Sequence, residues 1–287
     1  MTRLTVAAAQ IACQPADIDV NLASHLAMIE QARRRGVDLL VFPELSLTDY
    51  LAQPDCAALA LGRDAAPLSL LARAAAPMAV SVGFIEGDAQ GRVFNAQALL
   101  AGGGIAAVHR KLNLPGYGSL REDQVYDAGE VLLPADLGQG WRAATLICAD
   151  SWNPALPWLA ALAGANLLLV PVASSRGAVA GGFDNPRGWE INLAHTAMTY
   201  GLPTIFANHC GQRGGFDFWG GSRILDARGI ALAQAGDGPG LIVAEVDFAA
   251  GVAARQNLPT IRDSDPVLIH RLLQEHLLGT HLSCAKA

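Results

Sequence analysis

The most constraining feature of this sequence is a regular alternation between short apolar runs and longer segments with helical spacing. A strand is predicted over residues 5–13, and a helix over 20–35 follows it, with apolar residues every three or four positions. Gly36 then stops the helix, and a second buried strand follows at 37–42. Because a long crossover can return the chain in the same direction, this order favours parallel strands.

The rest of the chain extends this pattern and adds short strands towards its end. Further strands are predicted at 78–86, 95–101, 142–148, 165–171, 202–209, 222–227, 230–236 and 240–247, and helices at 154–164 and 183–201. Glycine turns between several late strands favour antiparallel pairing. The sequence therefore predicts an α/β protein with a mixed sheet structure and helices outside it. No segment resembles a linker, so we expect one domain over 1–287.

Composition excludes several classes of protein. Of the 287 residues, 52% are hydrophobic and 16% are charged, which excludes a disordered chain. The net charge of −6, without a Lys/Arg cluster, argues against a nucleic-acid partner. No apolar run is long enough to span a bilayer, and we find no signal peptide, so no membrane partner is expected. The five scattered cysteines argue against a disulfide framework and favour a reducing cytoplasm.

The motifs present predict no cofactor. Residues 138–143 fit the G-x-G-x-x-A pattern of dinucleotide-binding turns, but they precede a strand instead of opening a helix. The chain has no G-x-x-x-x-G-K-[ST] phosphate loop, and no His/Cys/Asp cluster has metal-ligand spacing. We therefore expect neither a nucleotide cofactor nor a metal ion.

Cys148 is the first candidate for chemistry. It ends a predicted strand, and the segment that follows, ADSWNPALPW, turns sharply into a helix. A nucleophile at such a turn projects from the sheet edge, with backbone N–H groups near it to receive an oxyanion. The helix N-terminus would favour the thiolate over the thiol. The alternative is an inert buried cysteine, which is the usual state of a free thiol.

Three charged residues could act with this cysteine. None of the seven histidines follows a strand in a similar way, so a carboxylate is the better candidate for a base. Glu44 follows the buried strand LLVFP and is either a cap for the next element or an active-site group. Lys111 lies in or beside a loop rich in proline and glycine, and Glu122 follows it; taken alone, each is more typical of a solvated surface charge.

Together these segments resemble the carbon–nitrogen hydrolase (nitrilase) superfamily. FPELSLTDY resembles the glutamate motif of that family and corresponds to a base at Glu44. HRKLNLPGYG resembles its lysine motif, at Lys111, and LICADSW resembles its cysteine motif, with Cys148 as nucleophile. YGSLRED and DAG continue the pattern and match the second, assisting glutamate to Glu122.

The resemblance covers nearly the whole chain. It extends over residues 5–247 and leaves 248–287 as a C-terminal extension. It implies a four-layer α-β-β-α sandwich of the nitrilase type. It also implies a homodimer, or a higher homo-oligomer, because members of the family usually dimerise through helices.

The resemblance also implies a mechanism. Cys148 attacks the carbonyl carbon of an amide, Glu44 transfers the protons, and a thioester forms as ammonia leaves. Water activated by Glu44, with help from Glu122, then releases the carboxylic acid. Lys111 and the backbone N–H of Ala149 stabilise the oxyanion. A carboxylate can take the thiol proton, so no histidine is required.

The surroundings of the substrate are matched less closely. Besides Ala149, we expect Tyr117, Ser174 and Arg176 to contact the substrate. The segments CADSWNP and ELSLTDY are most similar to the glutaminase-type amidase branch, and Ala149-Asp150 stands where nitrilases in the narrow sense have Trp-Glu. We therefore expect a small primary amide with an aliphatic or amino-acid-like acyl group as the substrate.

Two alternatives remain open. The first is a nitrile or N-carbamoyl hydrolase with the same triad, which a comparison of amide and nitrile turnover would distinguish. The second is a non-catalytic binding protein on the same fold. A broken triad would favour that second alternative, but all three members are present in this sequence.

Overall fold

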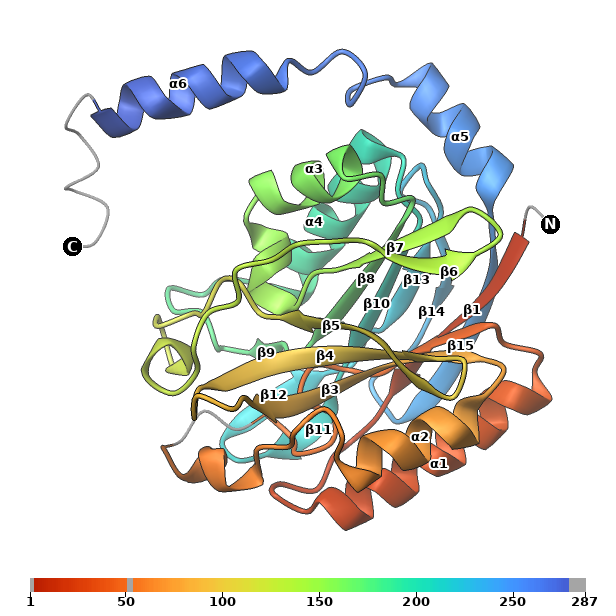
Figure 1. Cartoon of the computed structure of the whole chain (residues 1–287), viewed down its shortest axis with the longest axis vertical. Coiled ribbons are helices and arrows are strands. Elements are labelled where there is room, and N and C mark those ends of the chain that lie inside the picture. The colour runs from red at the N-terminus through yellow and green to blue at the C-terminus, as the bar shows by residue number, and fades with distance from the viewer. Residues whose placement is uncertain (1–2, 51–53, 279–287) are drawn as a thin grey trace.

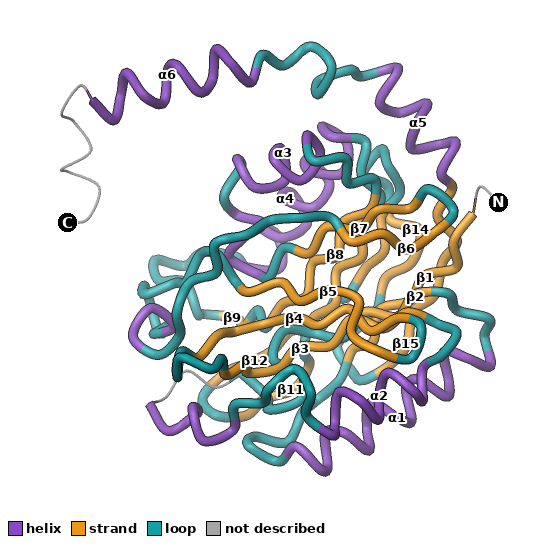
Figure 2. Tube along the Cα trace, in the orientation of Figure 1, coloured by secondary structure: helices purple, strands orange, loops and turns teal. Residues whose placement is uncertain are grey.

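The computed structural model describes residues 3–50 and 54–278. The helices in these ranges are α1 (Ile18–Arg34), α2 (Ala66–Ala75), α3 (Ala155–Leu162), α4 (Asn185–Tyr200), α5 (Phe248–Asn257) and α6 (Pro266–Leu278). The short 3-10 helices are η1 (Pro54–Leu59), η2 (Glu122–Gln124) and η3 (Cys148–Trp152). Figure 1 shows α1 and α2 on one side of the strands and α3 and α4 on the other, and Figure 2 shows the same arrangement by secondary structure.

The first sheet contains the N-terminal strands. In spatial order its strands are β15 (Gly240–Asp247), β1 (Arg3–Gln10), β2 (Leu39–Val41), β3 (Ala79–Gly87), β4 (Val93–Ala101) and β5 (Gly104–Arg110). β1, β2 and β3 are parallel, as the strand–helix–strand order of the sequence predicts. β15 pairs antiparallel with β1, and β4 pairs antiparallel with both β3 and β5.

The second sheet has the same size and a similar plan. In spatial order its strands are β14 (Ala231–Gln234), β13 (Arg223–Leu225), β10 (Thr204–Asn208), β8 (Leu167–Val172), β7 (Trp141–Thr145) and β6 (Ala135–Gly138). Its middle strands β10, β8 and β7 are parallel, and its outer strands are antiparallel to their neighbours. A third, small sheet contains β11 (Cys210–Arg213), β12 (Phe216–Trp219) and β9 (Ser175–Arg176).

Side chains that alternate along the strands build separate cores on the two faces of each sheet. In β2, Leu39 and Val41 contact the core shared by both sheets, whereas Leu40 belongs to the core under α1 and α2. In β8, Leu169 faces the shared core and Leu168 faces α3 and α4. Burial on both faces explains why these strands are continuously apolar in sequence. The predicted four-layer α-β-β-α sandwich is confirmed.

Capping interactions mark the ends of α1 and α4, the helices that the sequence predicts over 20–35 and 183–201. The Asp17 carboxylate accepts a hydrogen bond from the backbone N–H of Val20 at the start of α1. Asp184 caps α4 in the same way. Gly201 ends α4 in the left-handed conformation, with φ of 58°, which glycine adopts without a Cβ penalty.

Several elements were not predicted from the sequence. α2 lies in an alanine-rich segment, and alanine gives little contrast between the buried and exposed faces of a helix. β5 has only partly buried or exposed side chains, and β6, β9, β11 and β12 are two to four residues long. Such strands are held by partners elsewhere in the chain, so their own sequence carries no clear period.

The last two helices lie differently with respect to the sandwich. In α5, Arg255 donates hydrogen bonds to the backbone carbonyls of Tyr200 and Ala165, at 3.1 and 2.6 Å, which fixes this helix against the body. α6 extends away from the sheets in Figure 1. Within residues 3–50 and 54–278, no helix is both long enough and apolar enough to cross a membrane. The last residues, 279–287, lie outside the described part of the chain.

Candidate active site

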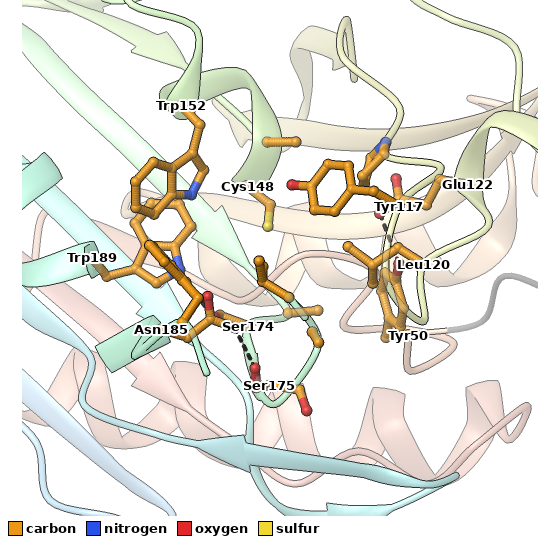
Figure 3. A pocket seen from close by; sticks show the side chains of 16 residues that line it. Tyr50, Tyr117, Leu120, Glu122, Cys148, Trp152, Ser174, Ser175, Asn185 and Trp189 are labelled. Atoms are coloured by element: carbon orange, nitrogen blue, oxygen red, sulfur yellow. Dashed lines mark hydrogen bonds between the residues drawn. The ribbon is translucent and has the colours of Figure 1, made fainter. Parts of the chain in front are cut away.

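Cys148 occupies a sharp turn between a strand and a helix. The strand predicted over 142–148 ends earlier, at Thr145, and Cys148 is the first residue of η3. Its φ of 44° lies in the left-handed region, which residues other than glycine rarely adopt. A strained turn of this kind places a nucleophile clear of the backbone around it. In Figure 3 the sulfur of Cys148 points into a pocket.

Glu44 is a fully buried carboxylate with a hydrogen-bond donor at each oxygen. Its Oε1 accepts from Lys111 Nζ at 2.6 Å and from Asn95 Nδ2 at 2.7 Å. Its Oε2 accepts from the backbone N–H of Ala173 at 2.8 Å. The same Ala173 N–H is also within hydrogen-bonding reach of the Cys148 thiol, where it acts to lower the pKa of that group, so the carboxylate and the thiol share one donor. The predicted base and nucleophile therefore lie close together.

Lys111 lies between the two predicted glutamates. Its Nζ is 2.6 Å from Glu44 Oε1 and 2.7 Å from Glu122 Oε2, and all three side chains are buried. Burial alone would lower the pKa of Lys111, but the charges of Glu122 and Glu44 outweigh it and hold this pKa well above its usual value. Glu122 Oε1 also accepts a hydrogen bond from this ammonium, at 2.8 Å, so three carboxylate oxygens surround it.

Glu122 supports the lysine from the other side. Its Oε1, besides its contact with Lys111, accepts a hydrogen bond from the Tyr50 hydroxyl at 2.8 Å. Its Oε2 accepts a hydrogen bond from Asn95 Nδ2 at 3.3 Å. Burial raises the pKa of Glu122 to about 7, although Lys111 acts in the opposite direction. This carboxyl therefore titrates close to neutral pH.

The resting form of the nucleophile differs from the expectation drawn from its position. Burial and the charge of Glu44 raise the pKa of the Cys148 thiol well above its usual value, and Lys111 only partly opposes them. The thiolate that a helix N-terminus would favour is therefore not the resting state, because desolvation penalises the charged form. An attack by this sulfur would therefore require a base that takes the thiol proton.

Asp150 joins the lysine segment to the cysteine turn. Its Oδ1 accepts from the backbone N–H groups of Leu112 and Asn113 at 3.0 and 2.8 Å. Its Oδ2 accepts from the backbone N–H of Ile147 at 3.1 Å and lies 3.1 Å from His109 Nε2. One buried carboxylate thus holds together two chain segments that each carry a catalytic candidate. No pattern in the sequence indicates this role for Asp150.

A second buried network holds the backbone of Glu44. His209 Nε2 donates to the Glu44 carbonyl at 2.6 Å, and Arg213 donates to His209 Nδ1 at 2.7 Å. The Arg213 guanidinium also forms a bidentate pair with Asp49, with both distances 2.6 Å. Burial lowers the pKa of His209, which keeps the ring neutral. This neutral ring can therefore donate on one side and accept on the other.

Cys13, Asp49 and His209 lie within metal-ligand distance of one another, but their donor atoms are already engaged. Both Asp49 oxygens are paired with Arg213, and the Cys13 thiol donates to a backbone carbonyl at 3.1 Å. Burial raises the pKa of Cys13 well above its usual value, which disfavours the thiolate that a metal needs. This cluster therefore does not suit a metal ion, and Arg213 supplies the positive charge instead.

The pocket in front of Cys148 has a volume of about 290 Å³. Its lining residues are Tyr50, Pro115, Tyr117, Leu120, Glu122, Cys148, Ala149, Trp152, Ala173, Ser174, Ser175, Ala178, Val179, Phe183, Asn185 and Trp189. Figure 3 shows Trp152 and Trp189 on one side of the cysteine and Tyr117 on the other. Three of the four predicted substrate contacts, Ala149, Tyr117 and Ser174, thus line the pocket.

The fourth predicted substrate contact lies elsewhere. Arg176 does not belong to the described pocket lining, and its side chain is 51% exposed. Its guanidinium lies 3.7 Å from the carboxylate of Asp217 on the neighbouring strand of the small sheet. Alternation along β9 explains the difference, because the preceding residue, Ser175, is buried and lines the pocket.

Other contributors to the site carry weak signals in the sequence. Tyr50 ends the quoted segment FPELSLTDY, and Asn95 opens a strand that is otherwise almost entirely apolar, so both were visible as unexplained polar residues. Ala173 acts through its backbone N–H, which no side-chain pattern reveals. No sequence pattern distinguishes the three aromatic residues of the pocket lining from ordinary core residues; these are Trp152, Phe183 and Trp189.

Comparison with known proteins gives the same family throughout. A profile of the carbon–nitrogen hydrolase family matches residues 5–256. Glutamine-dependent NAD(+) synthetase of Thermotoga maritima is 32% identical over 235 residues, which are 81% of this chain but only 40% of the length of that relative. Deaminated glutathione amidase of Mus musculus is 29% identical over 279 residues, covering 92% of this chain and 84% of that protein.

Solved structures share the fold. A carbon–nitrogen hydrolase from Helicobacter pylori G27 superimposes with a TM-score of 0.84 at 24% identity, over 95% of this chain and 99% of that one. A double mutant of the amidase from Nesterenkonia sp. AN1, in complex with acrylamide, gives 0.79 at 25% identity over 94% and 97% of the two chains. The chain belongs to the carbon–nitrogen hydrolase family of the nitrilase superfamily and is a hydrolase of non-peptide carbon–nitrogen bonds.

Proposed function

We propose that this protein hydrolyses primary amides to a carboxylic acid and ammonia through a thioester on Cys148. The observation that carries this proposal is the position of the Lys111 ammonium, 2.6 Å from Glu44 and 2.7 Å from Glu122, beside a cysteine that lines a pocket. The arrangement supplies a base, a cation for the oxyanion and a nucleophile within one buried cluster.

In the first half-reaction, Glu44 takes the thiol proton while the sulfur of Cys148 bonds to the carbonyl carbon. The raised pKa of this thiol makes such a base necessary. The ammonium of Lys111 and the backbone N–H of Ala149 hold the oxyanion. The carbon–nitrogen bond then breaks, Glu44 returns the proton to the nitrogen, and ammonia leaves a thioester behind.

In the second half-reaction, a water molecule gives a proton to Glu44 and bonds to the thioester carbon. The carbon–sulfur bond then breaks, the acid leaves, and Glu44 returns its proton to the sulfur of Cys148. Glu122 assists by holding Lys111, which it contacts at 2.7 Å, in the position needed for both oxyanions. The amidases among the relatives support an amide substrate.

The proposal is tested with matched amide and nitrile pairs and ammonia detection. We expect higher kcat/KM for each amide and an acyl adduct on Cys148 in the mass spectrum of a rapidly quenched reaction. Cys148→Ala should lose at least about a thousandfold in kcat, since the covalent path is gone, whereas Cys210→Ala, at a buried cysteine outside the pocket lining, should retain activity. Faster turnover of the nitriles, or an active Cys148→Ala variant, would contradict the proposal.

We also propose that the protein is a cytoplasmic homodimer. Cys13, Cys148 and Cys210 carry free thiols, which fits a reducing compartment. The apolar side chains along α6 are exposed on a single copy of the chain, and a second copy would cover them.

A further inference from the structure

The pocket in front of Cys148 has an unusual lack of charge for a site expected to hold an amino-acid-like acyl group. Of the 16 residues that line it, only Glu122 is ionisable to a charge near neutral pH, and this carboxyl is already paired with Lys111. No arginine or lysine belongs to the described lining.

The polar side chains of the lining are largely occupied by the protein. The Ser174 hydroxyl accepts hydrogen bonds from Trp189 Nε1 at 2.9 Å and Trp219 Nε1 at 3.0 Å. The Ser175 hydroxyl donates to a backbone carbonyl at 3.0 Å, and the Tyr50 hydroxyl donates to Glu122. These groups therefore hold the walls in place, and together with the neutral Tyr117 hydroxyl and Asn185 amide they leave an uncharged and largely apolar surface towards the ligand.

Aromatic side chains form much of that surface. Trp152 packs edge-to-face on Trp189, with ring centroids 5.0 Å apart, and on Phe183, at 5.9 Å. Trp189 is buried, but Trp152 and Phe183 remain 37% and 43% exposed although they line the pocket. Exposed aromatic rings beside a reactive cysteine offer contact area for an apolar ligand.

We infer that the substrate carries an uncharged, apolar acyl group, either aromatic or extended aliphatic; this inference rests on the proposed amidase function. A carboxylate on the acyl group would lose its hydration in this pocket without a cation to replace it, which is strongly unfavourable. The volume of about 290 Å³ is roughly ten times the share of one water molecule in the liquid. The pocket thus has room for a group much larger than the methyl group of acetamide.

A pair of amides of equal length isolates the charge. Pentanamide and glutaramate differ only by a terminal methyl group in one and a carboxylate in the other. We expect kcat/KM for pentanamide to exceed that for glutaramate at least a hundredfold, and phenylacetamide to exceed acetamide at least tenfold. Equal or faster turnover of glutaramate would overturn the inference and leave the amidase function standing. Absence of ammonia and of any adduct on Cys148 with all four amides would overturn both.

Variants of the wall test which residues carry the preference. Phe183→Ala should lower the ratio of kcat/KM for phenylacetamide to that for acetamide at least fivefold, because the larger acyl group loses more contact. Val179→Arg should raise kcat/KM for glutaramate at least tenfold by supplying a cation at the lining. Leu232→Ala, at an exposed position on β14, is the matched control. It should leave the phenylacetamide-to-acetamide ratio and kcat/KM for glutaramate unchanged. If neither quantity changes in Phe183→Ala and Val179→Arg, the proposal that these residues contact the acyl group is contradicted.

Discussion

At the scale of single residues, the site is a balance of buried charges. One ammonium, on Lys111, is shared by Glu44 and Glu122, and uncharged donors on Asn95 and Tyr50 complete the hydrogen bonding of the carboxylates. A buried charge that loses its partner is strongly destabilising, so each member depends on the others. Burial, with a smaller contribution from the charge of Glu44, raises the pKa of Glu122 to about 7.

Glu122 is expected to set the acid limb of the pH–rate profile. Its pKa is raised to about 7, and Lys111, Tyr50 and Asn95 all donate to its oxygens, so a proton on this carboxyl displaces a donor. We therefore expect kcat/KM to fall as the pH is lowered through about 7. In Glu122→Gln the limb at about 7 should be absent and activity at pH 8 lower. Glu130→Gln, at an exposed position, should keep the limb.

The same residue predicts a change of stability with pH. The pKa of Glu122 lies above its ordinary value of 4.5, so the folded state holds a proton that the unfolded state has released between about 4.5 and 7. The contribution of Glu122 to the free energy of unfolding therefore falls as pH rises through this window. We compare the melting temperatures of the wild type and Glu122→Gln at pH 5 and pH 8. The melting temperature of the variant, relative to that of the wild type, should be higher at pH 8 than at pH 5. A constant difference would contradict the assigned titration.

At the scale of secondary-structure elements, the carboxyl ends of the parallel strands supply most of the site. Glu44 follows β2 in the first sheet, whereas Cys148, Ala173 and His209 follow β7, β8 and β10 in the second. Parallel strands end at one edge of their sheet, so their following loops meet there. Lys111 comes from the end of the antiparallel strand β5 and enters the site from the side.

Gly83 on β3 makes room for the loop that carries Glu44, the proposed base. A Cβ at this position would lie 2.3 Å from the Leu45 backbone nitrogen and 2.5 Å from the Pro43 carbonyl oxygen, on either side of Glu44. Gly83→Ala must therefore shift this loop, and we expect a loss of roughly 1–3 kcal/mol in the free energy of unfolding, together with at least tenfold lower kcat. Urea denaturation and steady-state kinetics measure the two effects.

Gly104→Ala is the matched control for this substitution. Gly104 opens β5, which lies in the same sheet beyond β4, and a Cβ there meets nothing within 4 Å. We expect stability and kcat close to those of the wild type. Equal losses in both variants would show that the effect comes from the general cost of replacing a strand glycine and not from the loop of Glu44.

At the scale of the whole molecule, the two sheets share one apolar core, and the site lies where their loops meet. Val41 of the first sheet and Leu169 of the second belong to that core, and both are fully buried. A shared core supports the prediction that residues 1–287 form one domain, which stays a prediction. α6 lies outside this organisation, with a row of apolar side chains at Ile269, Leu273 and Leu277 that recurs every four residues.

Charges placed on the apolar row of α6 should convert the proposed dimer to a single chain. We expect the wild type to behave in light scattering as twice its chain mass of 29.9 kDa. The double substitution Leu273→Glu and Leu277→Glu places charges on the row and should shift the protein to the mass of one chain. Gln274→Glu, at an exposed polar position of the same helix, should not. A wild-type protein of single-chain mass would contradict the proposed dimer.

The sequence by itself determined most of the elements and the identity of the four central residues. Strands and helices were visible because apolar periodicity is local, and Glu44, Lys111, Cys148 and Glu122 each lie in a short segment typical of the family. The end of the first helix before Gly36 was also visible, because a helix stop is a local signal.

The tertiary structure decided how these residues act. The fold brings the Lys111 ammonium to the Glu44 carboxylate, although the two residues are 67 positions apart in sequence. It also brings His209 to the Glu44 backbone carbonyl from 165 positions away. Burial in that cluster gives Cys148 its raised pKa, and alternation along a two-residue strand removes Arg176 from the pocket lining. Distance, burial and the direction of a side chain depend on how the two sheets pack, and no local pattern in the sequence contains that information.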